Sequence, residues 1–326
     1  MKKQINKSDL KKLAKISQII KQSKTFFIAG HSKPDGDSLG AAFALRSMLH
    51  KLGKKAEVYC LDKIPPSLSL IKPFSQVKTS VKKSDLFDCA IILESLNFER
   101  MGNIISAQQA KKIINIDHHL LYGNFADVNY VVADSSSVSE LVLNLFEFMK
   151  IKPNKEETQN LYIGLVTDTG YFKQANTNAN SHIAAQKLLS LGVSPDFVER
   201  NIFSQKTLSS LNLLGAALAN IKIWQELKTA YMIIDQKMFK KTKSSQSDIE
   251  GIISYSLKLK GIKAGVLFVE EEKNSIKVGF RSHKEFDVLS IAKKFGGGGH
   301  KNAAGCVIKK DLNSVIKIIK GAFNAR

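Results

Sequence analysis

The sequence predicts an α/β protein in which an N-terminal doubly wound, mostly parallel sheet domain is joined by a helical linker to a smaller C-terminal α/β domain. Three observations lead to this prediction. Buried-strand runs alternate with helical patterns in the first half of the chain. At 326 residues the chain is long for a single core. The pattern changes again after a long helical stretch, so we place the first domain at 1–205, the linker at 206–225 and the second domain at 226–326.

The elements of the first domain follow from the spacing of apolar residues. Leucine and isoleucine at helical spacing predict an amphipathic helix over 6–23. Apolar runs too short for helices predict strands at 26–29, 56–61, 87–93, 113–116 and 130–133. Longer patterns predict helices at 39–52 and 138–149, a short helix or strand at 161–166, and wholly helical structure over 180–222. Buried strands separated by helices are typical of a parallel sheet.

The second domain is predicted by the same criteria. Strands are expected at 231–234, 264–269, 275–281 and 305–308, and helices at 247–259, 288–295 and 312–323. The glycine run 296–299 lies before the last strand. Such a run by itself favours a flexible loop, although its free backbone N–H groups can also approach an anion closely.

Composition limits the class of protein. Hydrophobic residues make up 44% of the chain, which excludes a disordered protein. No apolar run is long enough to span a bilayer, and the first 24 residues do not resemble a secretory signal, so we expect a cytoplasmic protein with no membrane partner. Cys60, Cys89 and Cys306 lie far apart, as reduced core thiols do. The net charge of +20 favours a phosphate or nucleic-acid ligand, although lysine-rich usage can also reflect genome composition.

Acidic and histidine side chains gather at or just after the ends of the predicted elements. The residues with this placement are His31, Asp35, Asp37, Glu94, His118 and Asp168. Any one of them alone would more often be a helix cap or a satisfied polar group. Together, at the sheet edge where such folds bind ligands, they can hold two divalent cations through a shared carboxylate. The mixed ligands favour Mn²⁺, with Mg²⁺ or Co²⁺ as alternatives, and suit phosphoester hydrolysis.

The order of the motifs resembles the DHH phosphoesterase family. Asp117-His118-His119 is preceded by the cluster at 31–37 and followed by Thr167-Asp168-Thr169-Gly170. The segment 296–305, with Phe280-Arg281-Ser282 before it, is similar to that family's DHH-associated substrate domain. The resemblance spans the chain from about residue 20, and its compact layout is most similar to the nanoRNase branch of the family.

The resemblance implies a role for each matching residue. His31 and Asp35 would bind one metal, and Asp37, His118 and Asp168 the other, with residue 94 bridging them. Asp117 would orient His118. His119 would face the substrate phosphate, as a proton donor or as a charge stabiliser. The expected substrate-binding residues are Arg281, Ser282, Gly298, Gly299, His300 and Arg100.

The bridging position departs from the family pattern. Members usually carry Asp there, whereas this chain has Glu94. Glu is one methylene longer and has to fold back to bridge two ions, so metal affinity or preference can change. A milder interpretation is that the loop shifts slightly and Glu94 serves as the bridge.

The activity implied by the resemblance is hydrolysis of very short RNA to mononucleotides and of 3′-phosphoadenosine 5′-phosphate to AMP. One alternative is a phosphodiesterase of linear or cyclic dinucleotide signals. Another is a catalytically weak nucleic-acid-binding protein that keeps the fold and the positive charge. The resemblance also allows a homodimer, for which the residues themselves give no interface.

Overall fold

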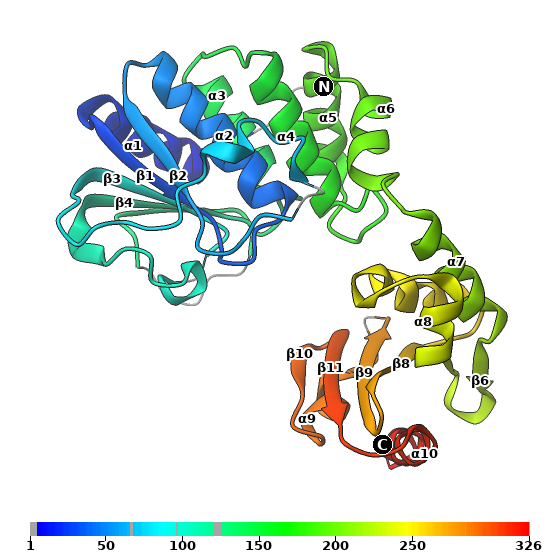
Figure 1. Ribbon diagram of the computed structural model, residues 1–326. Helices are drawn as coiled ribbons and strands as arrows, with labels where there is room; N and C mark the ends of the chain where they lie inside the picture. The colour runs from blue at the N-terminus through cyan, green and yellow to red at the C-terminus, as the bar shows by residue number, and fades with distance from the viewer. Residues whose placement is uncertain (1–4, 66–67, 96, 120–124, 284, 326) are drawn as a thin grey trace. The chain divides into compact units, whose positions relative to one another are not determined.

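Two sheets organise the chain, one in each of two units. The computed structural model describes residues 5–65, 68–95, 97–119, 125–283 and 285–325. The units comprise Met1–Gln205 and Lys206–Arg326 (Figure 1). The segment predicted as a linker, 206–225, contains helix α7 (Leu208–Ala219) and strand β6 (Lys222–Trp224), and β6 pairs with a strand of the second sheet.

The first sheet is parallel throughout, as the sequence predicts. Its strands are β1 (Thr25–Ala29), β2 (Lys55–Tyr59), β3 (Phe87–Leu93), β4 (Ala110–Asp117) and β5 (Val128–Val131). Their order across the sheet is β2-β1-β3-β4-β5, and each neighbouring pair is parallel. All five carboxyl ends therefore lie at one edge, which brings the loops after β1, β3 and β4 together.

Successive side chains of these strands enter two different cores. In β3, Ile91 and Leu93 pack with the helices, whereas Ala90 and Ile92 belong to a smaller cluster on the other face. The helical layer consists of α1 (Lys7–Gln22), α2 (Gly36–Lys51), α3 (Val138–Phe148), α4 (Lys155–Asp168) and α5 (Ala179–Ser190). The other face is covered by loops and short 3₁₀ helices, including η3 (Glu99–Met101) and η4 (Ala107–Gln109). Residues 161–166, predicted as a short helix or strand, lie within α4.

Glycines allow α2 and α4 to approach closely. A Cβ atom at Gly40 of α2 would collide with the backbone oxygen of Asn160 in α4. A Cβ atom at Gly164 of α4 would collide with Ser139 and lie 2.7 Å from Asp37 Oδ1. The close packing of these helices therefore depends on the absence of side chains, and it brings α4 against the first turn of α2.

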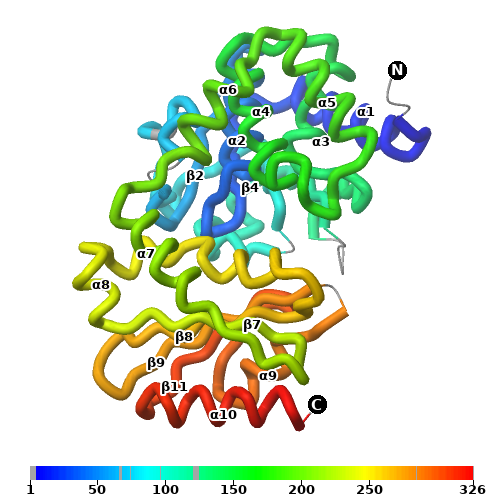
Figure 2. The backbone as a smooth tube through the Cα atoms, turned by 90° about the vertical axis from the view of Figure 1, so that its right-hand side faces the viewer, coloured from blue at the N-terminus to red at the C-terminus, as the bar shows by residue number. Residues whose placement is uncertain are grey.

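The second unit has a six-stranded sheet with helices on both faces. The strand order is β10-β11-β9-β8-β7-β6, antiparallel except for the parallel pair β7–β8. The strands after β6 are β7 (Thr229–Ile234), β8 (Ala264–Glu272), β9 (Ser275–Ser282), β10 (Gly298–His300) and β11 (Ala303–Ile308). Helices α9 (Leu289–Lys293) and α10 (Leu312–Asn324) contribute to one core, and α7 and α8 (Gln236–Thr242) to the other (Figure 2).

Most predicted elements are present, with three local differences. Residues 247–259, predicted as one helix, form two 3₁₀ helices, η7 (Gln246–Ile249) and η8 (Ile252–Lys258). The helical stretch 180–222 includes α6 (Pro195–Val198) and a π-helical turn at Glu199–Phe203, and it ends where β6 begins. The glycine run, expected to be a loop, contributes β10. Among the described residues, none of the helices is both long enough and apolar enough to cross a bilayer.

Candidate metal centre

The six predicted ligands come together at the carboxyl edge of the first sheet. They form two sets, within each of which the ligand atoms lie within 4.8 Å of one another, and Glu94 and His118 form a third such set with His119. We call His31, Asp35 and Glu94 the first triad, and Asp37, His118 and Asp168 the second triad. The side chains come from the loops after β1, β3 and β4, from the start of α2, and from the end of α4.

Glu94 touches a histidine of each triad. Its Oε1 atom lies 3.2 Å from His118 Nε2, and its Oε2 atom lies 3.9 Å from His31 Nε2. The backbone at Glu94 is left-handed, with φ of 51°, and its N–H donates to Ile116 at 3.1 Å. A left-handed backbone is uncommon for a residue other than glycine, so the turn at Glu94 is a special feature of this loop.

The tautomer of His118 leaves the lone pair of its Nε2 atom facing carboxylates. His118 Nδ1 lies 3.2 Å from the carbonyl oxygen of Ser135, so we assign the ring proton to Nδ1. The lone pair of His118 Nε2 then faces Glu94 and also Asp168, whose Oδ2 atom is 3.7 Å away. A divalent cation between these acceptors would satisfy them, as would a proton on Glu94 in the metal-free protein.

Burial makes this set of carboxylates unfavourable without a cation. Glu94 is only 2% exposed, and its Oε2 has no hydrogen-bond partner among the described residues. Burial raises the pKa of Glu94 well above its usual range, and the nearby carboxylates of Asp37, Asp35 and Asp168 raise it further. Burial, followed by Asp37 and Asp35, raises the pKa of Asp168 to about 8. These donors therefore fit a site for hard divalent cations.

Asp37 is fixed by the beginning of helix α3. Its two carboxylate oxygens accept the backbone N–H groups of Val138 at 2.6 Å and Ser139 at 2.9 Å. The positive end of the helix dipole favours this negative charge. Burial nevertheless raises the pKa of Asp37, while His118 acts in the opposite direction.

Asp117 differs from the role implied by the family resemblance. Instead of orienting His118, its Oδ1 atom accepts the His119 backbone N–H at 2.9 Å and lies 2.8 Å from His119 Nδ1. The reason is that His118 turns toward the Ser135 carbonyl on the other side of the loop. Asp117 therefore orients His119, whose side chain is 44% exposed.

Arg100 lies beside the loop that carries His31. It belongs to η3, and its backbone carbonyl accepts the N–H of Ser32 at 2.8 Å. The Arg100 side chain is exposed. The backbone of Arg100 is thus fixed next to the loop that carries the first triad.

The remaining predicted residues lie in the second unit, on neighbouring strands. Arg281 of β9 is opposite Ala303 of β11, which pairs in turn with His300 of β10. Gly298 and Gly299 lie on the same edge strand, and Gly299 has φ of 133°.

Ser282 differs from its predicted role in substrate binding. It is 8% exposed, its hydroxyl donates to the carbonyl of Phe286, and it accepts a hydrogen bond from Asn302 Nδ2 at 2.9 Å. The hydroxyl is thus engaged in holding the loop after β9.

The structure adds residues that the sequence does not reveal. Ser135 holds His118, and Asn176 Nδ2 donates to Asp168 Oδ2 at 3.0 Å. The serine run 135–137 is visible in the sequence, but a serine before a helix predicts a cap rather than a backbone partner for a distant histidine. Nothing in the sequence around Asn176 indicates its contact with Asp168, which requires the turn after α4.

Two family models match the chain, one within each unit. The family model of the DHH family, N-terminal domain, matches residues 25–167, and that of the DHHA1 domain matches residues 227–325. The chain is 28% identical over 287 residues to the bifunctional oligoribonuclease and PAP phosphatase NrnA of Bacillus subtilis, covering 87% of this chain and 89% of that protein. It is 27% identical over 302 residues to the Thermus thermophilus protein of the same name, covering 91% and 89%.

Solved structures share the fold. An exopolyphosphatase-related protein from Bacteroides fragilis superposes with a TM-score of 0.87 at 24% identity, covering 100% of this chain and 98% of that one. RecJ from Thermus thermophilus, crystallised with Mn²⁺, gives a TM-score of 0.54 at 13% identity, covering 98% of this chain and 54% of that one.

Proposed function

Because the chain belongs to the DHH phosphoesterase family, we propose that it is a two-metal enzyme that hydrolyses short oligoribonucleotides to mononucleotides and 3′-phosphoadenosine 5′-phosphate to AMP. Similarity to the NrnA proteins over about nine-tenths of the chain supports this choice of substrates. The observation that carries the proposal is the position of Glu94, whose two carboxylate oxygens approach a histidine of each triad.

The two triads would hold one cation each, with Glu94 shared between them. Bound divalent cations neutralise phosphoryl oxygens and lower the pKa of water enough for it to attack phosphorus at neutral pH. The carboxylate and imidazole donors favour Mn²⁺, the ion present in the related RecJ crystal. Carboxylates that are unfavourable alone become favourable around cations, so binding also stabilises the fold.

Residues beside the triads would position the phosphoester. His119, fixed by Asp117 and 44% exposed, would donate a proton to a leaving oxygen or stabilise its charge. Arg100 would bind a phosphate next to His31. In the second unit, Arg281 and His300 would bind phosphate.

The charge of the second unit supports a polyanionic substrate. Residues 206–326 contain 22 Lys and Arg against 10 Asp and Glu, a net charge of +12, which is more than half of the total of +20. The first unit, which carries the acidic triads, has a net charge of +8. Positive charge concentrated on one unit attracts phosphate chains, while the triads supply the cation sites.

The proposal is tested by incubating the purified chain with an RNA dinucleotide, an RNA trinucleotide and 3′-phosphoadenosine 5′-phosphate. Each reaction is run with Mn²⁺, with Mg²⁺ and with a chelator. We expect metal-dependent release of mononucleotides and AMP, and its loss in His118→Ala with the fold intact by circular dichroism. Full activity of that variant would contradict the two-metal proposal. Folded wild-type protein that binds RNA without turnover would instead indicate a nucleic-acid-binding protein.

A further inference from the structure

One short segment holds two of the three ligands of the second triad, His118 and Asp37. The segment Ser135–Ser139 runs from the loop after β5 into the first turn of α3, and all five of its residues are buried. The Ser135 carbonyl oxygen accepts a hydrogen bond from His118 Nδ1, which lies 3.2 Å away. The N–H groups of Val138 and Ser139 donate to the two oxygens of Asp37. Two ligands from distant parts of the chain are thus held by the main chain of one segment.

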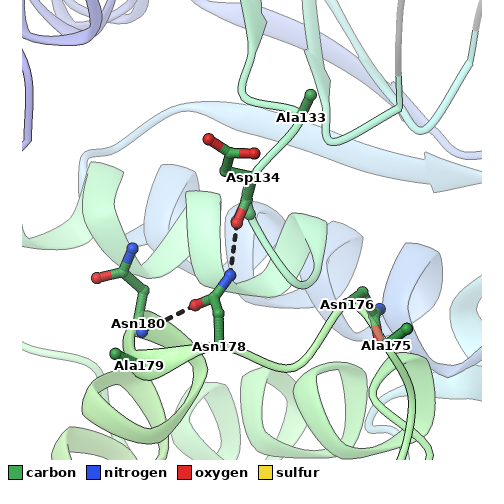
Figure 3. Close-up of a pocket in the computed structure, with 8 residues that line it drawn as sticks. Ala133, Asp134, Ala175, Asn176, Asn178, Ala179 and Asn180 are labelled. Atoms are coloured by element: carbon green, nitrogen blue, oxygen red, sulfur yellow. Dashed lines mark hydrogen bonds between the residues drawn. The ribbon is translucent and has the colours of Figure 1, made fainter.

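Asn176 connects the third ligand to the same segment. Its Nδ2 group lies 3.0 Å from Asp168 Oδ2, 3.1 Å from the Asp168 carbonyl and 3.0 Å from the Ser136 carbonyl. All three neighbours are acceptors, so the donor nitrogen, and not the amide oxygen, has to face them. Figure 3 shows Asn176 at the wall of a pocket that Ser135 and Asn180 also line. Asn176 is therefore the side chain that links Asp168 to Ser135–Ser139.

The first triad is built differently. Asp35 is the N-cap of α2, where it accepts the Ser38 N–H at 2.9 Å, and it contacts His31 directly at 3.2 Å. His31 and Asp35 are thus held by their own loop and by each other, whereas Glu94 comes from the loop after β3. In the described residues, the bonds from Ser135–Ser139 and Asn176 reach the second triad and not His31 or Asp35.

We infer that Asn176 is a positioning residue that, together with Ser135–Ser139, fixes the second triad as a unit and sets the cation affinity of that triad separately from the first. This inference rests on the proposed two-metal function. The donor from Asn176 keeps Asp168 Oδ2 beside His118, where both atoms face the same cation. Without that donor, the carboxylate is free to turn away, and one of the two cation sites weakens.

The test compares Asn176→Leu, which keeps approximately the same volume without a donor, with Asn180→Leu in the same pocket as the matched control. Binding of Mn²⁺ is counted from the electron paramagnetic resonance signal of the free ion and measured by isothermal titration calorimetry. We expect wild type and Asn180→Leu to bind two ions, and Asn176→Leu to bind one of them about 10- to 100-fold more weakly. Asn176→Ser, which retains one donor, should recover part of that loss.

Folding is checked by thermal melting in chelator, a measurement that does not depend on cation binding. If Asn176→Leu does not fold, the comparison is made with Asn176→Ala and Asn176→Ser. Two ions bound with wild-type affinity by the folded donorless variant would overturn the inference, and so would an equal weakening of both ions. A wild-type chain that binds no Mn²⁺ would instead overturn the proposed function.

Discussion

Glu94 combines features that are costly unless a cation is present. It is buried, its backbone is left-handed, and it lies among three other carboxylates of the triads. A residue in this backbone region is strained unless the surrounding structure holds it there. Here the Ile116 carbonyl holds the backbone, and the two histidines receive the side chain. Removing the charge of Glu94 should therefore weaken cation binding and raise the stability of the metal-free protein.

We predict that Glu94→Gln lowers Mn²⁺ affinity by at least about 100-fold, because a shared charged ligand is lost. In chelator, the same variant should melt at a higher temperature than wild type at pH 8, because folding no longer has to keep a buried carboxyl group protonated above its unfolded pKa or to bury its charge. Melting with and without Mn²⁺ measures both effects. A variant that is less stable than wild type in chelator would show that Glu94 has a structural partner.

The raised pKa values predict how the stability of the metal-free protein depends on pH. Folding raises the pKa of Asp168 from the usual value near 4 to about 8, and it raises that of Glu94 in the same direction. The folded state then binds more protons than the unfolded state, so stability falls as pH rises from about 4 to 8. Urea unfolding in chelator at pH 5 and pH 8 checks this prediction, and saturating Mn²⁺ should reduce the difference. Equal stability at both pH values without metal would contradict it.

At the scale of elements, the contact between α2 and α4 places the second triad. Gly164 of α4 leaves room for Asp37 and Ser139, which come from two other helices. The position of the second triad therefore depends on helix packing at Gly164, a residue that is not itself a ligand.

We predict that Gly164→Ala destabilises the protein by about 1–3 kcal/mol, because the added methyl group overpacks this junction. It should also weaken Mn²⁺ binding, since Asp37 has to move. The matched control is Gly321→Ala in α10, where an added Cβ meets nothing within 4 Å and better helix propensity should stabilise by up to about 1 kcal/mol. Chemical denaturation and Mn²⁺ titration of both variants decide the matter. Unchanged Mn²⁺ affinity in Gly164→Ala would show that helix packing at Gly164 does not affect the position of Asp37 in the metal centre.

Elements and ligands differ in how well the sequence predicts them. The strand ending at Leu93 and the acid after it are predictable, because an apolar run followed by a polar residue is a local signal. The 3₁₀ helices η7 and η8 are not, because Ile252 and Ser256 are buried at a spacing that also fits an α-helix. Strand β10 could not be predicted, because its glycines give no strand signal and favour a loop. The contacts of Ser135 and Asn176 depend on chain segments that meet only in the folded protein.

At the scale of the whole molecule, the two units divide the charges. The acidic triads lie in the first unit, and the larger positive net charge lies in the second. Binding of RNA should then be governed by phosphate contacts, and hydrolysis by the triads.

We predict that KM for a 5′-phosphorylated RNA trinucleotide rises about 5- to 25-fold between 50 and 500 mM salt, as expected when one or two phosphates are neutralised at about 0.7 ions each. The value of kcat should change little. Bis(p-nitrophenyl) phosphate, which carries a single charge, is the control and should show a weaker dependence. Equal salt dependence for the two substrates would argue against phosphate binding by the basic residues.

The spread of the ligands along the chain also has a consequence for biosynthesis. Strand β1 is the first strand to be synthesised, yet it lies inside the sheet between β2 and β3, and the last ligand, Asp168, follows His31 only after four more strands and three helices. A nascent chain released before residue 168 lacks a ligand of the second triad, whatever part of the sheet it has formed. Chains terminated before Asp168 are therefore unable to assemble the complete cation centre, and phosphoesterase activity is restricted to chains translated beyond that residue.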